Sequence, residues 1–124
     1  MNPNMLKIGI ISRQDYINRT IAIAKGRYKP KPDDPKVWFE SLDSVAEVLS
    51  PENRELLKVI VEKGPNSLKT LSDLTGRNSQ EVSKVLQRLA RYGIVEFRKE
   101  SRALKPIVKA TEFQVVVAVN GFVN

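Results

Sequence analysis

Apolar residues recur every three or four positions through the middle of the chain, whereas they form short runs or alternate near its two ends. The first spacing is typical of helices that bury one face, and the second is typical of strands. The middle therefore predicts three short helices between residues 50 and 92, and the ends predict strands over residues 5–11 and 113–119. This combination indicates an α+β fold.

Local sequence also sets the limits of the three helices. A Ser or Asn side chain at a helix start accepts hydrogen bonds from free backbone N–H groups, and Gly readily takes the left-handed conformation that ends a helix. The predicted starts are Ser50 before Pro51, Ser67, and Asn78 in a capping box with Glu81, and the predicted ends are Gly64, Gly76 and Gly93. The apolar positions expected to face the core are Leu56, Leu57, Ile60 and Val61 in the first helix, Leu68, Leu71 and Leu74 in the second, and Val82, Val85, Leu86 and Leu89 in the third.

The period of the apolar positions changes from helical to two after Gly93. The alternation predicts a strand over residues 95–98, a polar turn over residues 100–103 and a returning strand over residues 105–111. Pro106 cannot donate a backbone hydrogen bond, so we expect it at a strand start or on an edge. This segment therefore predicts a two-stranded antiparallel hairpin.

The residues before the three helices predict a strand–helix extension. Its expected elements, in order, are a strand over residues 5–11, a helix capped by Ser12 and closed by Gly26, an extended connector with three prolines over residues 27–36, a small apolar anchor at Val37–Phe39, and a short helix capped by Ser41 or Asp43.

The chain is therefore expected to have three parts, over residues 1–49, 50–111 and 112–124. The strands in the first and last parts are apolar on both faces and need cover on both. We expect these terminal strands to pair across subunits and to form a homodimer.

Positive charge is concentrated in one segment of the chain. The chain has 21 Lys and Arg against 14 Asp and Glu, a net charge of +7, and residues 77–109 alone contain nine basic and three acidic side chains, or +6. A basic surface of this kind attracts an anionic partner such as nucleic acid, although such a surface also simply favours solubility.

Composition also argues against several classes of function. The chain contains neither Cys nor His, so it lacks the thiol nucleophile and the commonest metal ligand and general base. We therefore expect no catalytic residues, no metal and no cofactor. No apolar run approaches the ~20 residues that span a bilayer, which predicts a cytoplasmic protein without a membrane partner.

The third helix carries the candidate contacts to DNA bases. At ~100° per residue, its polar residues fall opposite its apolar stripe, and Gln side chains suit adenine edges whereas Lys or Arg suits guanine. The expected base-reading residues are Asn78, Ser79, Gln80, Ser83, Lys84 and Gln87. An outward face that only contacts water is the alternative.

Contacts to the DNA backbone are expected from residues around this helix. The phosphate candidates are Lys69, Thr70, Arg77, Arg88 and Arg91, and the hairpin candidates are Arg98, Lys99, Arg102 and Lys105. Charges at a hairpin tip also protect an exposed sheet edge, which is the alternative for the second group.

Two further features remain open. Arg27, Lys29 and Lys31 form a second basic patch in the connector, which is either an arm that reaches DNA or a solvated linker. Trp38 and Phe39 fit core packing better than a small-molecule pocket.

Residues 50–110 resemble the DNA-binding core of MarR-like winged-helix transcriptional regulators. The resemblance lies in Ser67–Gly76, Arg77–Leu86, Leu89 and Arg91–Val95. The whole chain, including Lys7–Ser12 and Tyr28–Pro32, is also similar to a group of small prokaryotic proteins assigned to DNA binding. The resemblance implies that the helix from Asn78 enters the major groove and that the following hairpin is the wing.

The sequence thus predicts a winged helix-turn-helix domain with a two-stranded wing and an N-terminal strand–helix extension. The predicted function is a sequence-specific double-stranded DNA-binding transcriptional regulator of the repressor type, acting as a homodimer. The alternative is a protein-interaction module or an antitoxin-like regulator that also binds a toxin-like protein partner.

Overall fold

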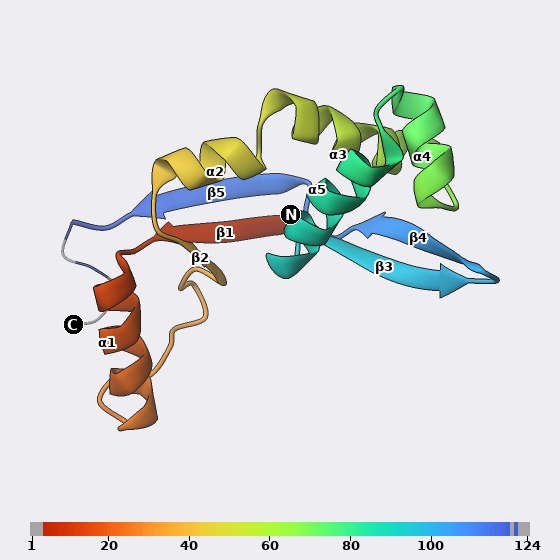
Figure 1. Ribbon diagram of the computed structural model, residues 1–124. Coiled ribbons are helices and arrows are strands. Elements are labelled where there is room, and N and C mark those ends of the chain that lie inside the picture. The colour runs from red at the N-terminus through yellow and green to blue at the C-terminus, as the bar shows by residue number, and fades with distance from the viewer. Residues whose placement is uncertain (1–3, 120, 122–124) are drawn as a thin grey trace. The chain divides into compact units, whose positions relative to one another are not determined.

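The computed structural model describes residues 4–119 and 121, and it has a mixed α+β fold (Figure 1). The described residues form five helices and two small sheets, and the chain divides into two compact units. Unit 1 contains Asn4 and Glu47–Thr111, and unit 2 contains Met5–Ala46 together with the described residues from 112 onward. No helix among the described residues is both long and apolar enough to cross a membrane.

Unit 1 contains three helices, α3 (Pro51–Lys63), α4 (Leu68–Thr75) and α5 (Ser79–Arg91). Their predicted starts are confirmed by hydrogen bonds to the capping side chains. Ser50 Oγ accepts from the N–H of Asn53 at 3.2 Å, and Ser67 Oγ accepts from the N–H of Thr70 at 3.1 Å. The predicted glycine ends are also confirmed, because Gly64, Gly76 and Gly93 all have positive φ angles, of 56°, 71° and 75°.

The core of unit 1 contains most of the apolar positions that the sequence singles out. Leu56, Leu71, Val82, Leu86 and Leu89 are all at most 1% exposed. Of the other expected core residues, Leu68 and Val85 are half-buried, and two are exposed.

These two exceptions are Val61 and Leu74, which are 57% and 49% exposed. Val61 lies about 100° around α3 from the buried Ile60, and Leu74 lies in the last turn of a helix of eight residues. The buried stripes of α3 and α4 are thus narrower than the predicted apolar faces, and the edges of these faces remain in contact with solvent.

The hairpin of unit 1 consists of β3 (Val95–Glu100) and β4 (Ala103–Val108), paired antiparallel. The predicted hairpin is therefore confirmed, although β3 is two residues longer than expected and β4 ends before Lys109. Pro106 lies opposite Phe97 in the middle of β4 and is fully buried. Each strand of a two-stranded sheet has a free edge, so the expected edge position of this proline is also confirmed.

Unit 2 contains β1 (Met5–Ile10), α1 (Arg13–Ala24), β2 (Val37–Phe39) and β5 (Glu112–Val117). The helix α2 (Leu42–Val48) begins in unit 2 and ends in unit 1. The three strands form one parallel sheet in the order β2-β1-β5. The anchor predicted at Val37–Phe39 is thus the edge strand β2.

The pairing of β1 with β5 corrects one prediction. The six residues of β1 align in register with the six residues of β5 within the same chain, from Met5 with Glu112 to Ile10 with Val117. The expectation that the terminal strands pair across subunits is therefore wrong for this pair, because each is the other's neighbour. The chain returns to β1 only after completing unit 1, and the local pattern holds no information on such a distant partner.

A buried arginine fixes the proline-rich connector to unit 2. Arg19 of α1 is 8% exposed, and its guanidinium lies 4.6 Å from the Trp38 ring centroid and 5.5 Å from the Tyr28 ring centroid. It also forms an ion pair with Asp34 at 3.4 Å. The connector is therefore held in place around these side chains, and no local spacing in the sequence relates them to one another.

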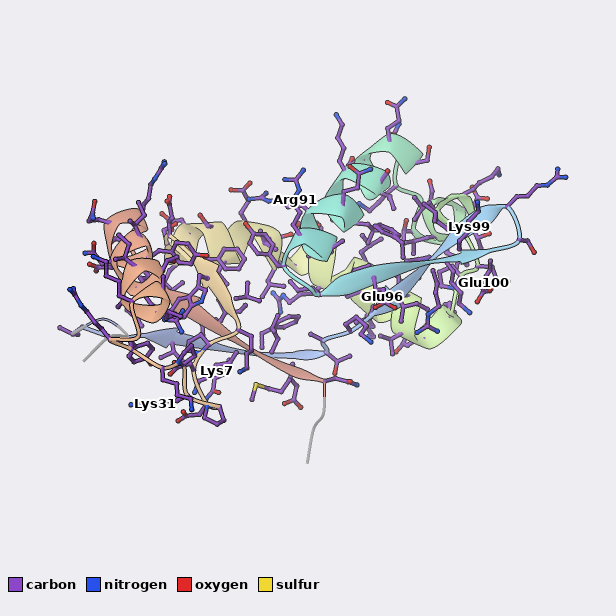
Figure 2. All side chains as sticks on the ribbon, turned by 90° about the horizontal axis from the view of Figure 1, so that it is seen from below. Lys7, Lys31, Arg91, Glu96, Lys99 and Glu100 are labelled. Atoms are coloured by element: carbon purple, nitrogen blue, oxygen red, sulfur yellow. The ribbon has the colours of Figure 1, made fainter. Side chains whose placement is uncertain are left out.

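The Trp38 ring also packs against the backbone of β1, which confirms core packing for this residue. A Cβ atom at Gly9 would lie 2.5 Å from the Trp38 ring and 2.9 Å from Pro35. Only glycine leaves room for this ring. Arg27, Lys29 and Lys31 of the connector are exposed. The Nζ of Lys7 donates a hydrogen bond to the Asp33 carbonyl oxygen. Figure 2 labels Lys7 and Lys31.

The Asp34 carboxylate is the centre of this cluster. One of its oxygens accepts from the Tyr28 hydroxyl at 2.6 Å and from the N–H of Lys31 at 3.0 Å. Burial disfavours the charged carboxylate, but these hydrogen bonds and Arg19 outweigh burial and hold the pKa of Asp34 below its ordinary value. The hydrogen bond that the Tyr28 hydroxyl donates to Asp34 also raises the pKa of Tyr28.

This cluster predicts a loss of stability in acid. A carboxyl group whose folded pKa is depressed adds stability above its unfolded pKa, and this stability is lost as the pH falls through the folded pKa. We expect the free energy of unfolding of the wild type to exceed that of the Asp34→Asn variant at pH 6, and this difference to narrow below about pH 4. Urea titrations followed by the fluorescence of Trp38, the single tryptophan of the chain, measure this difference. A difference that stayed constant between pH 6 and pH 3 would contradict the role assigned to Asp34.

Candidate nucleic-acid interface

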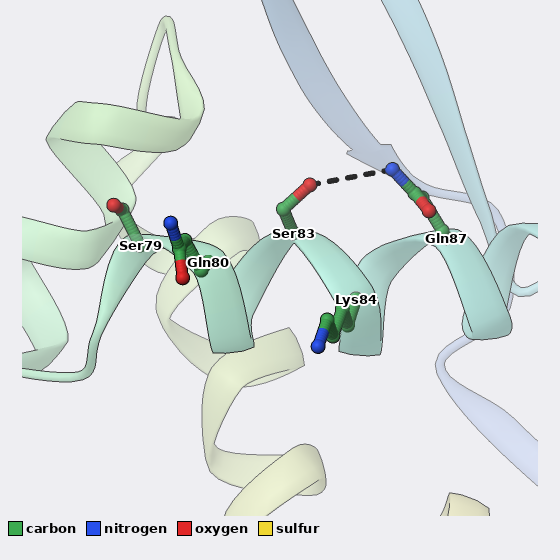
Figure 3. Close-up of a pocket in the computed structure, with 5 residues that line it drawn as sticks. All are labelled: Ser79, Gln80, Ser83, Lys84 and Gln87. Atoms are coloured by element: carbon green, nitrogen blue, oxygen red, sulfur yellow. Dashed lines mark hydrogen bonds between the residues drawn. The ribbon is translucent and has the colours of Figure 1, made fainter.

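One side of α5 brings together most of the predicted base-reading residues. Ser79, Gln80, Ser83, Lys84 and Gln87 line one shallow, open hollow on the surface of unit 1 (Figure 3). Their spacing places them on the side of the helix that faces away from the core. The structure therefore presents these five polar side chains together on one accessible face.

The core residues of α5 explain why this face is turned outward. Val82, Leu86 and Leu89 are buried against the rest of unit 1, and they repeat every three or four residues. Burying this stripe fixes the rotation of the helix about its axis. Gln80, Lys84 and Gln87 consequently remain exposed.

Asn78, the sixth predicted base-reading residue, has a different place. Its Oδ1 accepts hydrogen bonds from the N–H groups of Gln80 at 2.8 Å and Glu81 at 3.3 Å. The amide oxygen that a base contact would use is therefore engaged in capping α5. The structure thus separates Asn78 from the five residues of the hollow.

Two residues of the hollow are joined to each other. The Nε2 of Gln87 donates to the Oγ of Ser83 at 3.3 Å, one turn earlier on α5 (Figure 3). This hydrogen bond uses one of the two amide hydrogens of Gln87. The second hydrogen and the Oε1 acceptor remain available for an external partner.

Four of the five predicted phosphate contacts have partners inside unit 1. Arg77 donates to the Glu81 carboxylate at 2.7 Å and to the Glu52 carbonyl oxygen at 3.3 Å. Lys69 forms an ion pair with Asp73 at 3.3 Å, although both side chains are well exposed.

The hydroxyl of Thr70 is the third engaged group, since it lies 3.0 Å from the Ser67 hydroxyl at the start of α4. Arg88 is the fourth, because its guanidinium donates to the Glu47 carboxylate of α2 at 2.7 Å. The hydrogen bond from Glu47 outweighs partial burial and raises the pKa of Arg88 further. Arg77 and Arg88 therefore make stabilising contacts within unit 1 in the absence of any external partner.

Arg91 differs from these four residues. It lies at the C-terminal end of α5, is exposed (Figure 2), and has no ion-pair partner among the residues that the structure describes. Its guanidinium is available to an external anion without the loss of an internal contact.

The hairpin presents its basic residues in two different settings. Lys99 near the end of β3 and Arg102 in the turn are both exposed, and Lys99 is labelled in Figure 2. Arg98 and Lys105 lie directly opposite each other in the register, and Arg98 also contacts Glu96 at 3.6 Å. Two like charges placed opposite each other repel unless an anion lies between them.

One contact of the candidate interface could not be predicted from the sequence. Glu47 lies 41 residues before Arg88, so no helical or strand spacing relates the two side chains. By contrast, the Arg77–Glu81 pair has the i,i+4 spacing that favours an ion pair on or near a helix. Glu81 was expected only in the capping box.

Comparison with known proteins identifies one family. Residues 48–115, more than half of the 124 residues, match the HVO_A0114 family, and this segment includes α3, α4, α5 and the β3–β4 hairpin. No curated protein and no solved structure matches the chain. Because the family match covers most of unit 1 and more than half of the sequence, the chain belongs to the HVO_A0114 family.

Proposed function

We propose that this protein is a sequence-specific double-stranded DNA-binding transcriptional regulator, of the repressor type, that acts in the cytoplasm. In this proposal, unit 1 is a winged helix-turn-helix domain. The recognition helix is α5, which enters the major groove, and the wing is the β3–β4 hairpin.

The order of elements in unit 1 supports the proposed domain. A short turn with Gly76 in a left-handed conformation joins α4 to α5, and α5 is followed by Gly93 and then by the hairpin. Two helices joined by a short glycine-containing turn are the usual arrangement of a helix-turn-helix motif. The resemblance to MarR-like regulators covers the same residues.

The observation that carries the proposal is the chemistry of the exposed face of α5. Gln80, Lys84 and Gln87 combine amide groups that suit adenine with an ammonium group that suits guanine. The small Ser83 between them lets the helix approach the base edges closely. Glu81 is the single acidic residue of α5, and Arg77 neutralises it.

Basic residues around α5 support contacts to the DNA backbone. Arg91, Lys99 and Arg102 are exposed cations that can bind phosphates without first breaking an internal ion pair in the described part of the chain. Arg98 and Lys105 could share one phosphate, because a bound anion would relieve their mutual repulsion. In this proposal Arg77 and Arg88 mainly keep α5 in position.

A homodimer completes the proposal. DNA-binding dimers recognise two half-sites that are about one helical turn apart, and each subunit would then supply one copy of α5. An operator for this protein is therefore expected to be an inverted repeat.

Footprinting of the DNA upstream of the protein's own coding sequence tests this proposal. We expect a protected inverted repeat, and we expect a labelled duplex with this sequence to bind about 10³-fold or more tightly than a shuffled duplex at the same salt concentration. Equal affinity for both duplexes would contradict sequence-specific recognition.

A further inference from the structure

The sheet of unit 2 has two edges of very different character. In the order β2-β1-β5, the strand β2 forms one edge and β5 forms the other. The edge strand β2 has three residues and follows directly after Pro35 and Lys36. Short length, proline and lysine are the usual features that prevent an edge strand from pairing with another chain.

The opposite edge has none of these protective features. The strand β5 has six residues, and no charged residue and no proline occurs between Phe113 and Val119. Val115 and Val117 are 38% and 57% exposed, and Val119 just beyond the strand is 99% exposed. A long apolar edge strand of this kind is a template for pairing with a further strand.

We infer that β5 pairs with β5 of a second copy of this chain, so that the two three-stranded sheets join into one sheet of six strands. A second copy fits this edge because two identical strands related by a two-fold axis present self-complementary donors and acceptors. A two-fold axis also reverses the strand direction, so the new pairing is antiparallel.

Charge supports a second copy as the occupant of this edge. Residues 77–109 of unit 1 carry a net charge of +6, whereas the stretch between Phe113 and Val119 carries no charge, so pairing of two copies along this stretch places no like charges opposite each other. Antiparallel pairing centred within this stretch also keeps Glu112 of one copy away from Glu112 of the other. The same stretch offers no charge that would select an acidic or basic partner.

The interface explains how the proposed regulator would form its dimer, and to that extent it rests on the proposed function. The pairing itself requires no DNA. The inference also corrects the location expected from sequence, because β1 is internal and β5 alone of the two terminal strands has a free edge.

Sedimentation of a matched pair of variants tests this interface. Val117 and Val61 are both valines with 57% exposure, but Val117 lies on β5 and Val61 lies on α3. Placing two like charges at the new interface should raise the dissociation constant of the dimer about 100-fold in Val117→Lys. Val61→Lys should sediment like the wild-type dimer, and circular dichroism should show both variants folded.

A cross-linking scan gives a second and independent readout. The chain contains no cysteine, so single Cys substitutions at positions 114–118 each introduce a unique thiol. In an antiparallel pair, a residue lies opposite its own copy only close to the two-fold axis. The yield of disulfide-linked dimer should therefore be highest for the substitution nearest the axis and should fall sharply for positions before and after it.

Several outcomes would overturn the proposal. They are a wild-type monomer at micromolar concentration, an unchanged dimer in Val117→Lys, equal cross-linking along the whole strand, or occupation of the edge by a different protein in place of the second copy. A dimer that depends on β5 but binds no duplex would support this interface and contradict the proposed function instead.

Discussion

Raising the salt concentration from 50 to 200 mM should weaken binding of the dimer to its operator duplex by about 10³- to 10⁵-fold, the loss expected when six to ten phosphates are neutralised. Each neutralised phosphate releases condensed counterions, and added salt opposes this release. Arg91, Lys99 and Arg102 are three exposed cations in each chain. Two subunits would therefore provide six, and the Arg98–Lys105 pairs would add to this number.

Fluorescence anisotropy with a labelled operator duplex at four or more salt concentrations measures this effect. The slope of log affinity against log salt concentration gives the number of phosphates, and it should fall in magnitude by roughly two in the Arg102→Ala dimer, one for each subunit. Lys58→Ala is a suitable control, because Lys58 is an exposed lysine on α3 outside the proposed interface. An affinity independent of salt would exclude a DNA contact made through these residues.

Replacing Lys84 with Ala should reduce the preference of the protein for its operator over a duplex with one changed base pair. Lys84 lies in the middle of the exposed face of α5, and loss of one good base contact costs about 1–3 kcal/mol of discrimination, or roughly 5- to 150-fold. Arg102→Ala, at the hairpin turn, should instead weaken binding to all duplexes by a similar factor. Competition titrations with a set of single-base variants separate the two effects.

Thermal unfolding provides the control for this comparison. Both side chains are exposed, so neither substitution should change the melting temperature by more than the small shift typical of surface positions. Equal weakening of all duplexes by Lys84→Ala would contradict the role assigned to α5, and a changed base preference in Arg102→Ala would contradict the role assigned to the hairpin.

The limits of the helices in unit 1 could be predicted because they depend on neighbouring residues. Ser50 and Ser67 each cap the helix that follows them, and Gly64 and Gly76 each end a helix. The partners of the strands in unit 2 could not be predicted in the same way. The pairing of β1 with β5 joins residues more than 100 positions apart, and alternation within a strand carries no information on which strand lies beside it.

The candidate site shows the same difference between local and distant contacts. Helical spacing places Gln80, Lys84 and Gln87 on one face, and the structure presents them on that face. The spacing could not show that Arg88 is held by Glu47, because that contact depends on how α2 and α5 approach each other in three dimensions. The exposed face of a helix is therefore predictable, whereas the availability of each charged side chain on it is not.

Unit 2 is built from two segments that are far apart in the sequence, and this affects the order in which the chain folds during its synthesis. Unit 1 is formed by one nearly continuous stretch, whereas the sheet of unit 2 needs both β1 from the beginning and β5 from residues 112–117. A ribosome releases β1 about a hundred residues before β5, so β1 has no β5 strand to pair with during this interval. The helices and the hairpin of unit 1 can form in the same interval, because their contacts are close in sequence. Unit 1 can thus be complete on the nascent chain before the last strand emerges to close the parallel sheet.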